Sequence, residues 1–158
     1  MAVPSAEAMG RFGAALARSL PSVEAAPLLL YLAGDLGAGK TTLARGLLAQ
    51  LGAPGPVRSP TYTLVEMHAL PALTVVHADL YRLDDPAELE PLGLRERYAP
   101  RHLWIVEWPE RAGDALPGAD LHLLLTIEPA AHRVQGRGGT ARGAQWYAEA
   151  VELVGVSP

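Results

Sequence analysis

The sequence predicts an α/β fold: a single domain over residues 1–158, with a mixed, mostly parallel sheet flanked by helices. Two observations support this prediction. Residues 28–33 and 103–106 are apolar at every position, which is typical of strands that are covered on both faces. Other segments carry apolar residues at helical spacing, and no repeat or linker divides the chain. A chain of 158 residues is long enough to bury one core without metals or disulfides.

The first third of the chain predicts a helix, a strand and a second helix. Ser5 is a suitable cap for the first helix, and Pro21 ends its apolar pattern. The apolar strand at 28–33 leads through a glycine-rich turn into a helix over residues 40–51. Gly52 ends this second helix, because glycine readily adopts the left-handed conformation found at helix C-termini.

The rest of the chain predicts strands and helices in alternation. Two adjacent β-rich runs with a short link indicate a hairpin-like pair, which makes the sheet mixed. The predicted elements are a loop at 53–60, strands at 61–68, 73–77, 103–106 and 121–127, a helix start at 84–90, a loop at 136–139, a cap at Thr140 and a helix at 141–154.

Composition argues against several classes of protein. The formal net charge is −4 and no extended basic segment is present, so we expect any nucleic acid contact to run through a partner. The absence of cysteine excludes disulfides, thiolate zinc sites and a cysteine nucleophile, and it agrees with a cytoplasmic protein. The longest apolar run is far shorter than the roughly 20 residues of a membrane helix. No contact with a membrane is therefore expected.

Residues 34–41, GDLGAGKT, fit the phosphate-binding pattern G-x-x-x-x-G-K-[ST] in full. The match lies between a buried strand and a helix, which is the context that this pattern requires. Glycines let the backbone turn its N–H groups toward phosphate oxygens, Lys40 reaches the β- and γ-phosphates, and the Thr41 hydroxyl binds Mg²⁺. The sequence therefore predicts a P-loop NTPase-like domain that binds ATP with Mg²⁺. The loop residues predicted to contact the nucleotide are Asp35, Leu36, Gly37, Ala38, Gly39, Lys40 and Thr41.

The alternative for this loop is a glycine-rich turn that holds a lysine by chance. Lys40 is the only lysine of the chain, beside twelve arginines. A composition that otherwise uses arginine has kept lysine at the one position where a compact ammonium fits and a guanidinium does not. This observation favours the phosphate-binding interpretation.

Two carboxylates follow apolar strands and are candidates for catalysis beside Lys40. Glu107 comes directly after the run at 103–106 and is predicted to hold Mg²⁺, directly or through water. Asp79 ends the next β-rich run upstream and is predicted to orient the attacking water. The hydroxyls of residues 59–63 are either contacts to the γ-phosphate or ordinary turn residues. The histidines have no metal-ligand spacing and are predicted to be surface or strand-filling residues.

Four segments in the same order carry a resemblance that is more specific than the phosphate loop. They are GDLGAGKTT at 34–42, SPTYTLVE at 59–66, HADLYRL at 77–83 and VEWPE at 106–110. This succession resembles the bacterial TsaE (YjeE) family, the ATPase of tRNA threonylcarbamoyladenosine biosynthesis, and the likeness spans nearly the whole chain. The resemblance implies a small cytoplasmic ATPase. It also implies work with the TsaD and TsaB subunits, which modify adenosine 37 of tRNA, so that tRNA is reached through those partners.

The resemblance also implies roles for single residues. Thr41 and Glu107 would hold Mg²⁺, and Asp79 would assist hydrolysis. ATP hydrolysis in this family supports the modification cycle and does not itself form the product bond. The further residues that the resemblance puts near the nucleotide are Thr42, the loop at 59–63, Trp108 and Arg133.

Three other functions use the same loop. A small-molecule kinase would need an acceptor pocket and an arginine-bearing lid, for which Arg95, Arg97 and Arg101 are candidates, and it would transfer phosphate to an added metabolite. A GTP-driven switch would need an [NT]-K-x-D segment, which a chain without a second lysine cannot contain. A nucleotide-binding module with vestigial hydrolysis would differ only in whether partner subunits raise turnover.

Overall fold

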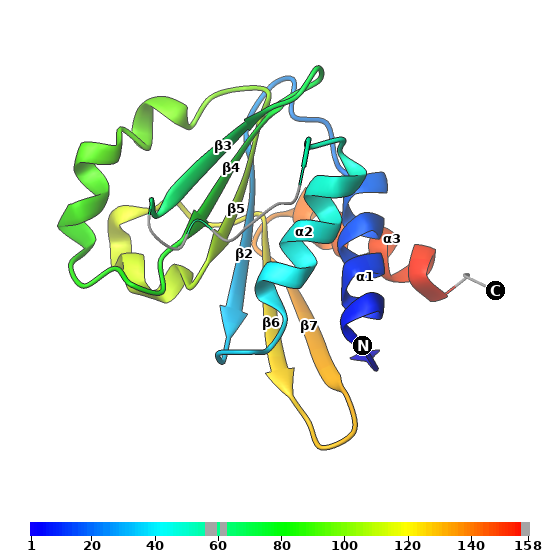
Figure 1. Cartoon of the computed structure of the whole chain (residues 1–158). Coiled ribbons are helices and arrows are strands. Elements are labelled where there is room, and N and C mark those ends of the chain that lie inside the picture. The colour runs from blue at the N-terminus through cyan, green and yellow to red at the C-terminus, as the bar shows by residue number, and fades with distance from the viewer. Residues whose placement is uncertain (56–59, 61–62, 156–158) are drawn as a thin grey trace.

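The computed structural model describes residues 1–55, 60 and 63–155. They form a seven-stranded sheet in the order β1-β7-β6-β2-β5-β4-β3, with helices on both faces (Figure 1). Among the described residues, no helix combines the length and apolar character that a bilayer span requires. The strands are β1 (Ala2–Val3), β2 (Leu28–Gly34), β3 (Val65–Ala69), β4 (Thr74–Asp79), β5 (His102–Glu107), β6 (Leu121–Ile127) and β7 (His132–Gly138).

The predicted mixed α/β sheet is confirmed. The four central strands β6, β2, β5 and β4 run parallel, whereas β3, β7 and β1 are added antiparallel at the two sides. The predicted hairpin-like pair is β3 and β4, in which Val65 pairs with Ala78 and Ala69 with Thr74. Because parallel strands end at the same edge of a sheet, the carboxyl ends of β2, β4 and β5 lie together, and this edge is where open α/β sheets bind ligands.

The apolar residues of β2 separate two cores. Leu28, Leu30 and Leu32 point to the face that is covered by the α-helices, while Leu29 and Tyr31 point to the opposite face. That alternation explains why the whole strand is apolar, since both of its faces are buried. The α-helices are α1 (Ala6–Arg18), α2 (Lys40–Gln50) and α3 (Ala141–Gly155), and the 3-10 helices on the other face are η1 (Pro86–Leu92), η2 (Arg95–Arg97) and η3 (Pro109–Ala115).

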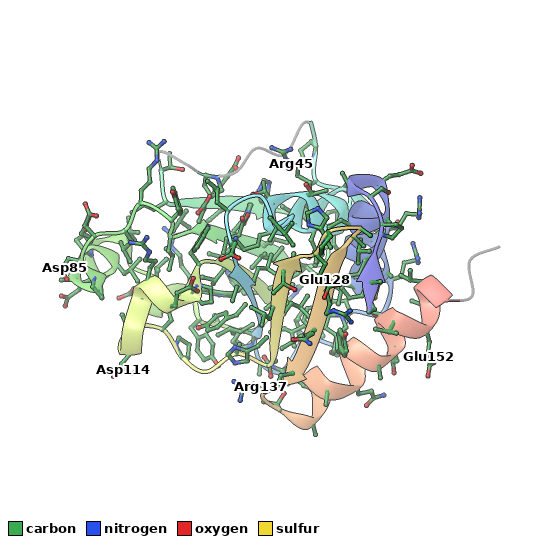
Figure 2. The ribbon with its side chains drawn as sticks, turned by 90° about the horizontal axis from the view of Figure 1, so that it is seen from below. Arg45, Asp85, Asp114, Glu128, Arg137 and Glu152 are labelled. Carbon is green, nitrogen blue, oxygen red and sulfur yellow. The ribbon has the colours of Figure 1, made fainter. Side chains whose placement is uncertain are left out.

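Local capping explains where the helices begin. The Ser5 hydroxyl accepts a hydrogen bond of 3.1 Å from the amide of Ala8, as predicted for the first helix. The Thr140 hydroxyl accepts one of 3.2 Å from the amide of Gly143 and so caps α3. Segment η1 begins at the predicted place but is a 3-10 helix, with Asp85 and Glu88 in a capping box. Figure 2 shows that Asp85 and Asp114 lie on the side of the molecule away from Glu152 of α3.

The predicted loop at 136–139 is wrong, because residues 132–138 form strand β7, which pairs with β6 along its whole length. Glycine here reflects helix packing and not a turn. A Cβ on Gly136 would lie 2.3 Å from Cδ2 of Tyr147, so α3 can approach β7 only over a residue without a side chain. The two-residue strand β1, which pairs with Arg133 and His132 of β7, was also not predicted.

Candidate functional site

The loop at 34–41 joins the carboxyl end of β2 to the first turn of α2. Gly34 has a φ of 125°, and a Cβ at this position would lie 1.9 Å from the backbone oxygen of Leu125. Gly39 precedes α2 in the left-handed conformation, and no side chain caps the helix. The first amide groups of α2 therefore receive no side-chain cap from Gly39, and an anion at the helix N-terminus is the usual group to occupy such a position.

Lys40 is the basic residue at the centre of this loop, and it is only 4% exposed. Its Nζ donates hydrogen bonds of 2.5 Å to the backbone oxygen of Gly34 and 2.8 Å to that of Asp35. The same Nζ lies 3.8 Å from the ring centroid of Trp108, which is a cation–π contact. Burial lowers the pKa of Lys40, and nearby carboxylates, Glu107 foremost, oppose this shift.

Glu107 ends β5 and binds two side chains from different parts of the chain. One carboxylate oxygen, Oε2, accepts a hydrogen bond of 2.8 Å from the Thr41 hydroxyl. The other, Oε1, lies 2.9 Å from Nε2 of His77. Glu107 is 1% exposed, so each partner compensates part of the cost of removing a carboxylate from water. The predicted pair of Mg²⁺ ligands, Thr41 and Glu107, therefore lies together.

Asp79 ends β4 and lies beside Glu107, since the two residues pair in register across the parallel strands. Its carboxylate Oδ1 accepts a hydrogen bond of 3.1 Å from the amide of Tyr81, and its own amide donates to the backbone oxygen of Leu64 at 2.9 Å. Leu64 has a φ of 59°, an uncommon conformation for a residue with a side chain. Asp79 is thus held at the strand end from both sides.

These side chains surround a cavity of about 380 Å³ at the carboxyl edge of the sheet. It brings together residues from the phosphate loop and from the ends of β4 and β5. Tyr81 and Arg82 also line it, although they were not among the predicted site residues. The predicted residues that line the cavity are Leu36, Gly37, Gly39, Lys40, Thr41, Thr42, Asp79, Glu107 and Trp108.

Three predicted residues do not line this cavity. The side chain of Ala38 is fully buried. Asp35 is not among the residues that line the cavity, and its backbone oxygen accepts a hydrogen bond from Lys40. Arg133 lies on β7 and pairs with Glu128 in a two-bond contact. The neighbouring His132 contacts the phosphate loop, with its Nδ1 3.1 Å from the backbone oxygen of Ala38.

The hydroxyls of residues 59–63 were interpreted as either contacts to the γ-phosphate or ordinary turn residues, and the resemblance put this loop near the nucleotide. Residues 59, 61 and 62 lie outside the described residues, so this contact stays a prediction. Residue 63 is described and is exposed.

His77 belongs to the site, and the sequence interpretation missed this role. It fills a strand, as predicted, and is fully buried. Its Nδ1 has no hydrogen-bond partner among residues 1–55, 60 and 63–155. If the proton is on Nε2, His77 donates a hydrogen bond to Glu107 and only the acceptor Nδ1 is left unpaired. With the proton on Nδ1, a buried donor would be unpaired and the lone pair of Nε2 would face the carboxylate, which costs more free energy. The spacing of His77 and Asp79 was the available signal, because residues two apart on a strand share a face.

Trp108 connects the site to η3 through an unusual backbone conformation. Its φ of 59° and ψ of 49° are left-handed, and Pro109 follows directly. Its ring lies 4.9 Å from that of Tyr81, centroid to centroid, and covers the ammonium of Lys40. Non-glycine residues in this conformation are found preferentially at functional sites, where the surrounding contacts hold them in place.

The described residues fit Mg²⁺ by the chemistry of their donors. A threonine hydroxyl and a carboxylate are hard oxygen ligands, and Mg²⁺ in nucleotide sites takes one or two protein ligands with phosphate oxygens and water. Among the described residues there is no group of three or more His, Asp or Glu that could form an all-protein metal cage. The Thr41–Glu107 pair matches the Mg²⁺ sites of nucleotide-binding proteins, in which the protein supplies only one or two ligands.

A sequence profile described as "Threonylcarbamoyl adenosine biosynthesis protein TsaE" matches residues 3–135 of the chain. The chain belongs to the TsaE family. A relative from Haemophilus influenzae, named tRNA threonylcarbamoyladenosine biosynthesis protein TsaE, is 44% identical over 120 residues, which are 75% of this chain and 76% of that protein. One from Streptomyces coelicolor with the same name is 35% identical over 146 residues, covering 88% and 97%.

The fold is similar to a solved structure. The crystal structure of YdiB from Bacillus subtilis matches with a TM-score of 0.78 and 23% identity, over 97% of this chain and 93% of that one. This likeness confirms the predicted P-loop-type α/β fold. The TsaE profile and the names of the relatives confirm the family, which takes part in threonylcarbamoyladenosine biosynthesis.

Proposed function

We propose that this protein binds ATP with Mg²⁺ at the loop 34–41 and hydrolyses it, and that this hydrolysis supports the threonylcarbamoylation of adenosine 37 in tRNA by TsaD and TsaB. The observation that carries the proposal is the contact of 2.8 Å between the Thr41 hydroxyl and Glu107, within a cavity that Lys40 and Asp79 also line. A bound nucleoside triphosphate requires ligands for its Mg²⁺, a positive charge near its phosphates and a group that positions water. The site provides two oxygen ligands, one ammonium and one further carboxylate at a helix N-terminus.

Each of these residues has a distinct task in the proposed reaction. Lys40 binds the β- and γ-phosphates by exchanging its backbone acceptors for phosphate oxygens, and its charge stabilises the transferred group. Thr41 and Glu107 hold Mg²⁺, which neutralises negative charge on the phosphates when it is bound. Asp79 accepts a hydrogen bond from the attacking water and orients it.

The partnership is supported by the family and by charge. The relatives are named for tRNA threonylcarbamoyladenosine biosynthesis. A chain of net charge −4 has little means of holding tRNA by itself, so TsaD and TsaB would hold the RNA. The proposed place of action is the cytoplasm, where tRNA is modified.

The test is ATP hydrolysis by the purified protein, alone and with the TsaD–TsaB pair, for wild type and Lys40→Ala. We expect turnover that rises with the pair and is lost in the variant. Near-normal turnover by Lys40→Ala would refute the assignment of the site, while turnover that is indifferent to the pair would refute the partnership. Phosphate transfer to an added metabolite in place of water would indicate the small-molecule kinase instead.

A further inference from the structure

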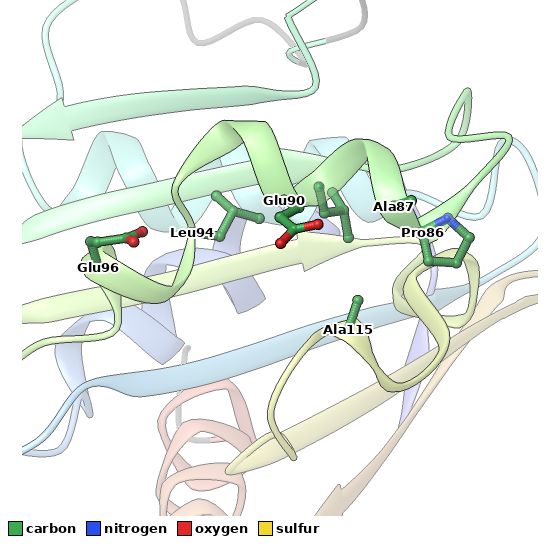
Figure 3. Close-up of a pocket in the computed structure, with 7 residues that line it drawn as sticks. Pro86, Ala87, Glu90, Leu94, Glu96 and Ala115 are labelled. Carbon is green, nitrogen blue, oxygen red and sulfur yellow. The ribbon is translucent and has the colours of Figure 1, made fainter.

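A second cavity, of about 450 Å³, separates η1 from η3 on the face of the sheet opposite the α-helices (Figure 3). Its floor includes Leu89 and Leu94, which are 4% and 6% exposed. Figure 3 shows Glu90 and Glu96 on the η1–η2 side and Ala115 across from them. This groove, defined by these residues with Pro86 and Ala87, lies outside the nucleotide cavity and shares no lining residue with it.

The groove has an apolar neighbour. A cavity of about 320 Å³ shares Leu94 and Ala115 with it and adds Tyr98, Trp104 and Leu116. Tyr98 is 45% exposed, so apolar surface reaches the solvent here. The two cavities are neighbours that share Leu94 and Ala115, and both are lined by leucine side chains. An apolar side chain of a protein segment could fill such a lining.

The charge of the groove is negative. Residues 84–96, which contain the η1–η2 side of the groove, carry five carboxylates and one basic residue, Arg95. Of the described residues that line the groove, Glu90 and Glu96 are acidic and none is basic, and Asp114 lines the neighbouring cavity. Because complementary charges guide the encounter of proteins, the side chains that fit this rim are lysine and arginine.

The two walls of the groove continue directly into the nucleotide site. Segment η3 begins at Pro109, immediately after Trp108 and Glu107 of the site. Segment η1 follows Asp79 along the chain, and Tyr81 and Arg82 between them line the nucleotide cavity. A segment inserted between η1 and η3 would therefore press on the two chain segments that carry the site carboxylates.

We infer that this groove docks a segment of a partner protein that inserts an apolar side chain between η1 and η3 and flanks it with lysine or arginine. This inference rests on the proposed function, since it identifies the surface through which the TsaD–TsaB pair acts on ATP turnover. Docking moves η1 relative to η3, and the movement reaches Asp79 and Glu107 through their own chain segments.

The experiment measures binding of the full chain to the purified TsaD–TsaB pair by calorimetry, at low and at physiological salt. Glu90→Lys combined with Glu96→Lys reverses the charge of the groove, and we expect it to weaken the dissociation constant at least about ten-fold. Ala87→Trp fills the groove without a change of charge and is expected to weaken binding as well. Wild-type binding should weaken as salt rises.

Matched controls lie on α3, far from the groove. Glu149→Lys combined with Glu152→Lys makes the same change of charge, and Ala148→Trp adds the same side chain at an exposed helix position. Both controls are expected to bind within about two-fold of wild type, as surface substitutions usually do. Turnover of ATP by each variant without the pair should equal that of wild type, and thermal melting by circular dichroism verifies that each is folded.

The outcomes separate the docking groove from the proposed function. If wild type binds the pair and both groove variants bind like their controls, the docking inference is overturned and the function stands. An equal loss in groove variants and controls overturns it too, because a general effect of charge or bulk would then explain the loss. Failure of wild type to bind the pair overturns the partnership and the groove together, whereas ATP turnover by the lone chain is judged separately.

Discussion

Two buried carboxylates lie at opposite ends of β2, and their surroundings differ. Asp120, beside the amino end of this strand, receives four hydrogen bonds, from the amide of Leu29, the hydroxyl of Thr140 and two nitrogens of Arg142, at 2.8 to 2.9 Å. Glu107, at the carboxyl end, binds one hydroxyl and one imidazole. The first carboxylate is fully paired with donors of the protein. Within the described part of the chain, the second receives only these two contacts and retains acceptor capacity, which suits a group that takes up a ligand.

The pKa shifts of the charged residues also differ between the two ends of β2. Burial by itself raises the pKa of Asp120, but the hydrogen bonds from Arg142, Leu29 and Thr140, with the charge of Arg142, outweigh it and lower the pKa. At the other end of the sheet, burial lowers the pKa of Lys40, and the nearby carboxylates do not overcome that effect. At the amino end of β2, the contacts of Asp120 favour its charged form and stabilise the fold. At the carboxyl end, the contacts of Lys40 do not fully offset the burial of its charge, as is common at functional sites.

The largest expected effect concerns the functional end. Lys40→Ala should lower ATP turnover about 100- to 1,000-fold, because the transferred phosphate loses its main positive charge. The free energy of unfolding should change less than it does on removing Asp120. Arg45→Ala, an exposed position on the same helix, is the control and should keep normal turnover. Steady-state kinetics measure the turnover and urea denaturation measures the free energy of unfolding. A loss of stability without a loss of turnover in Lys40→Ala would contradict a functional role for Lys40.

Removal of the other carboxylate should have the opposite profile. Asp120→Ala leaves the guanidinium of Arg142 and the amide of Leu29 without their acceptor, so we expect the free energy of unfolding to fall by about 2–3 kcal/mol. Affinity for ATP should stay within about three-fold, since Asp120 does not line the nucleotide cavity. Asp114→Ala, which removes an exposed carboxylate, should leave stability within about 0.5 kcal/mol. Comparable losses in the two variants would contradict the structural role of Asp120.

A smaller effect tests how Glu107 is held. His77→Leu removes the donor to Oε1 and should weaken Mg²⁺-dependent binding of ATP about ten-fold, as loss of a group that orients a metal ligand commonly does. Binding of ATP without Mg²⁺ serves as the internal control and should change little. His77→Gln, which retains an N–H donor, should restore part of the Mg²⁺ dependence. If both substitutions weaken the two modes of binding equally, His77 has only a packing role.

The smallest effect is the pH dependence at the structural end. The folded pKa of Asp120 lies below its ordinary value of 3.8, so the unfolded chain binds more protons between the two values. The stabilisation is complete above the ordinary value and is lost as pH falls through the folded one. The difference in unfolding free energy between wild type and Asp120→Asn should therefore be constant near neutrality and narrow below about pH 4. A difference that grows on acidification would have the wrong sign.

The strands and the phosphate loop could be predicted from the sequence because local patterns determine them. The apolar runs of β2 and β5 are buried on both faces, and the glycines of the loop carry left-handed φ angles that other residues rarely adopt. Strand β7 could not be predicted in this way. Only Val134 of its residues is buried, and Gly136 is needed by Tyr147 of a helix that follows later in the chain.

The strand-end carboxylates of the site could be predicted from the order of apolar runs along the chain. The side-chain contacts between neighbouring strands could not. Glu107 and Asp79 follow apolar runs, so their meeting at one edge follows from parallel pairing. The spacing of His77 and Asp79 puts both residues on one face of β4, but it does not show that the His77 ring contacts Glu107 on the next strand. The resemblance puts Arg133 near the nucleotide, which stays a prediction, whereas its ion pair with Glu128 follows from the register of β6 with β7 and had no signal in the sequence.

The contact between Trp108 and Lys40 gives the protein an intrinsic optical reporter. The chain has three tryptophans, and the other two are buried, with Trp104 1% and Trp146 0% exposed and both indole N–H groups bound to backbone oxygens. Only the indole of Trp108 faces an ammonium, at 3.8 Å, and that ammonium is the group expected to leave for the phosphates. Nucleotide binding should therefore alter tryptophan emission, and Trp108→Phe should abolish the change while Trp104 and Trp146 continue to emit. The occupancy of the site can then be followed in real time without a label.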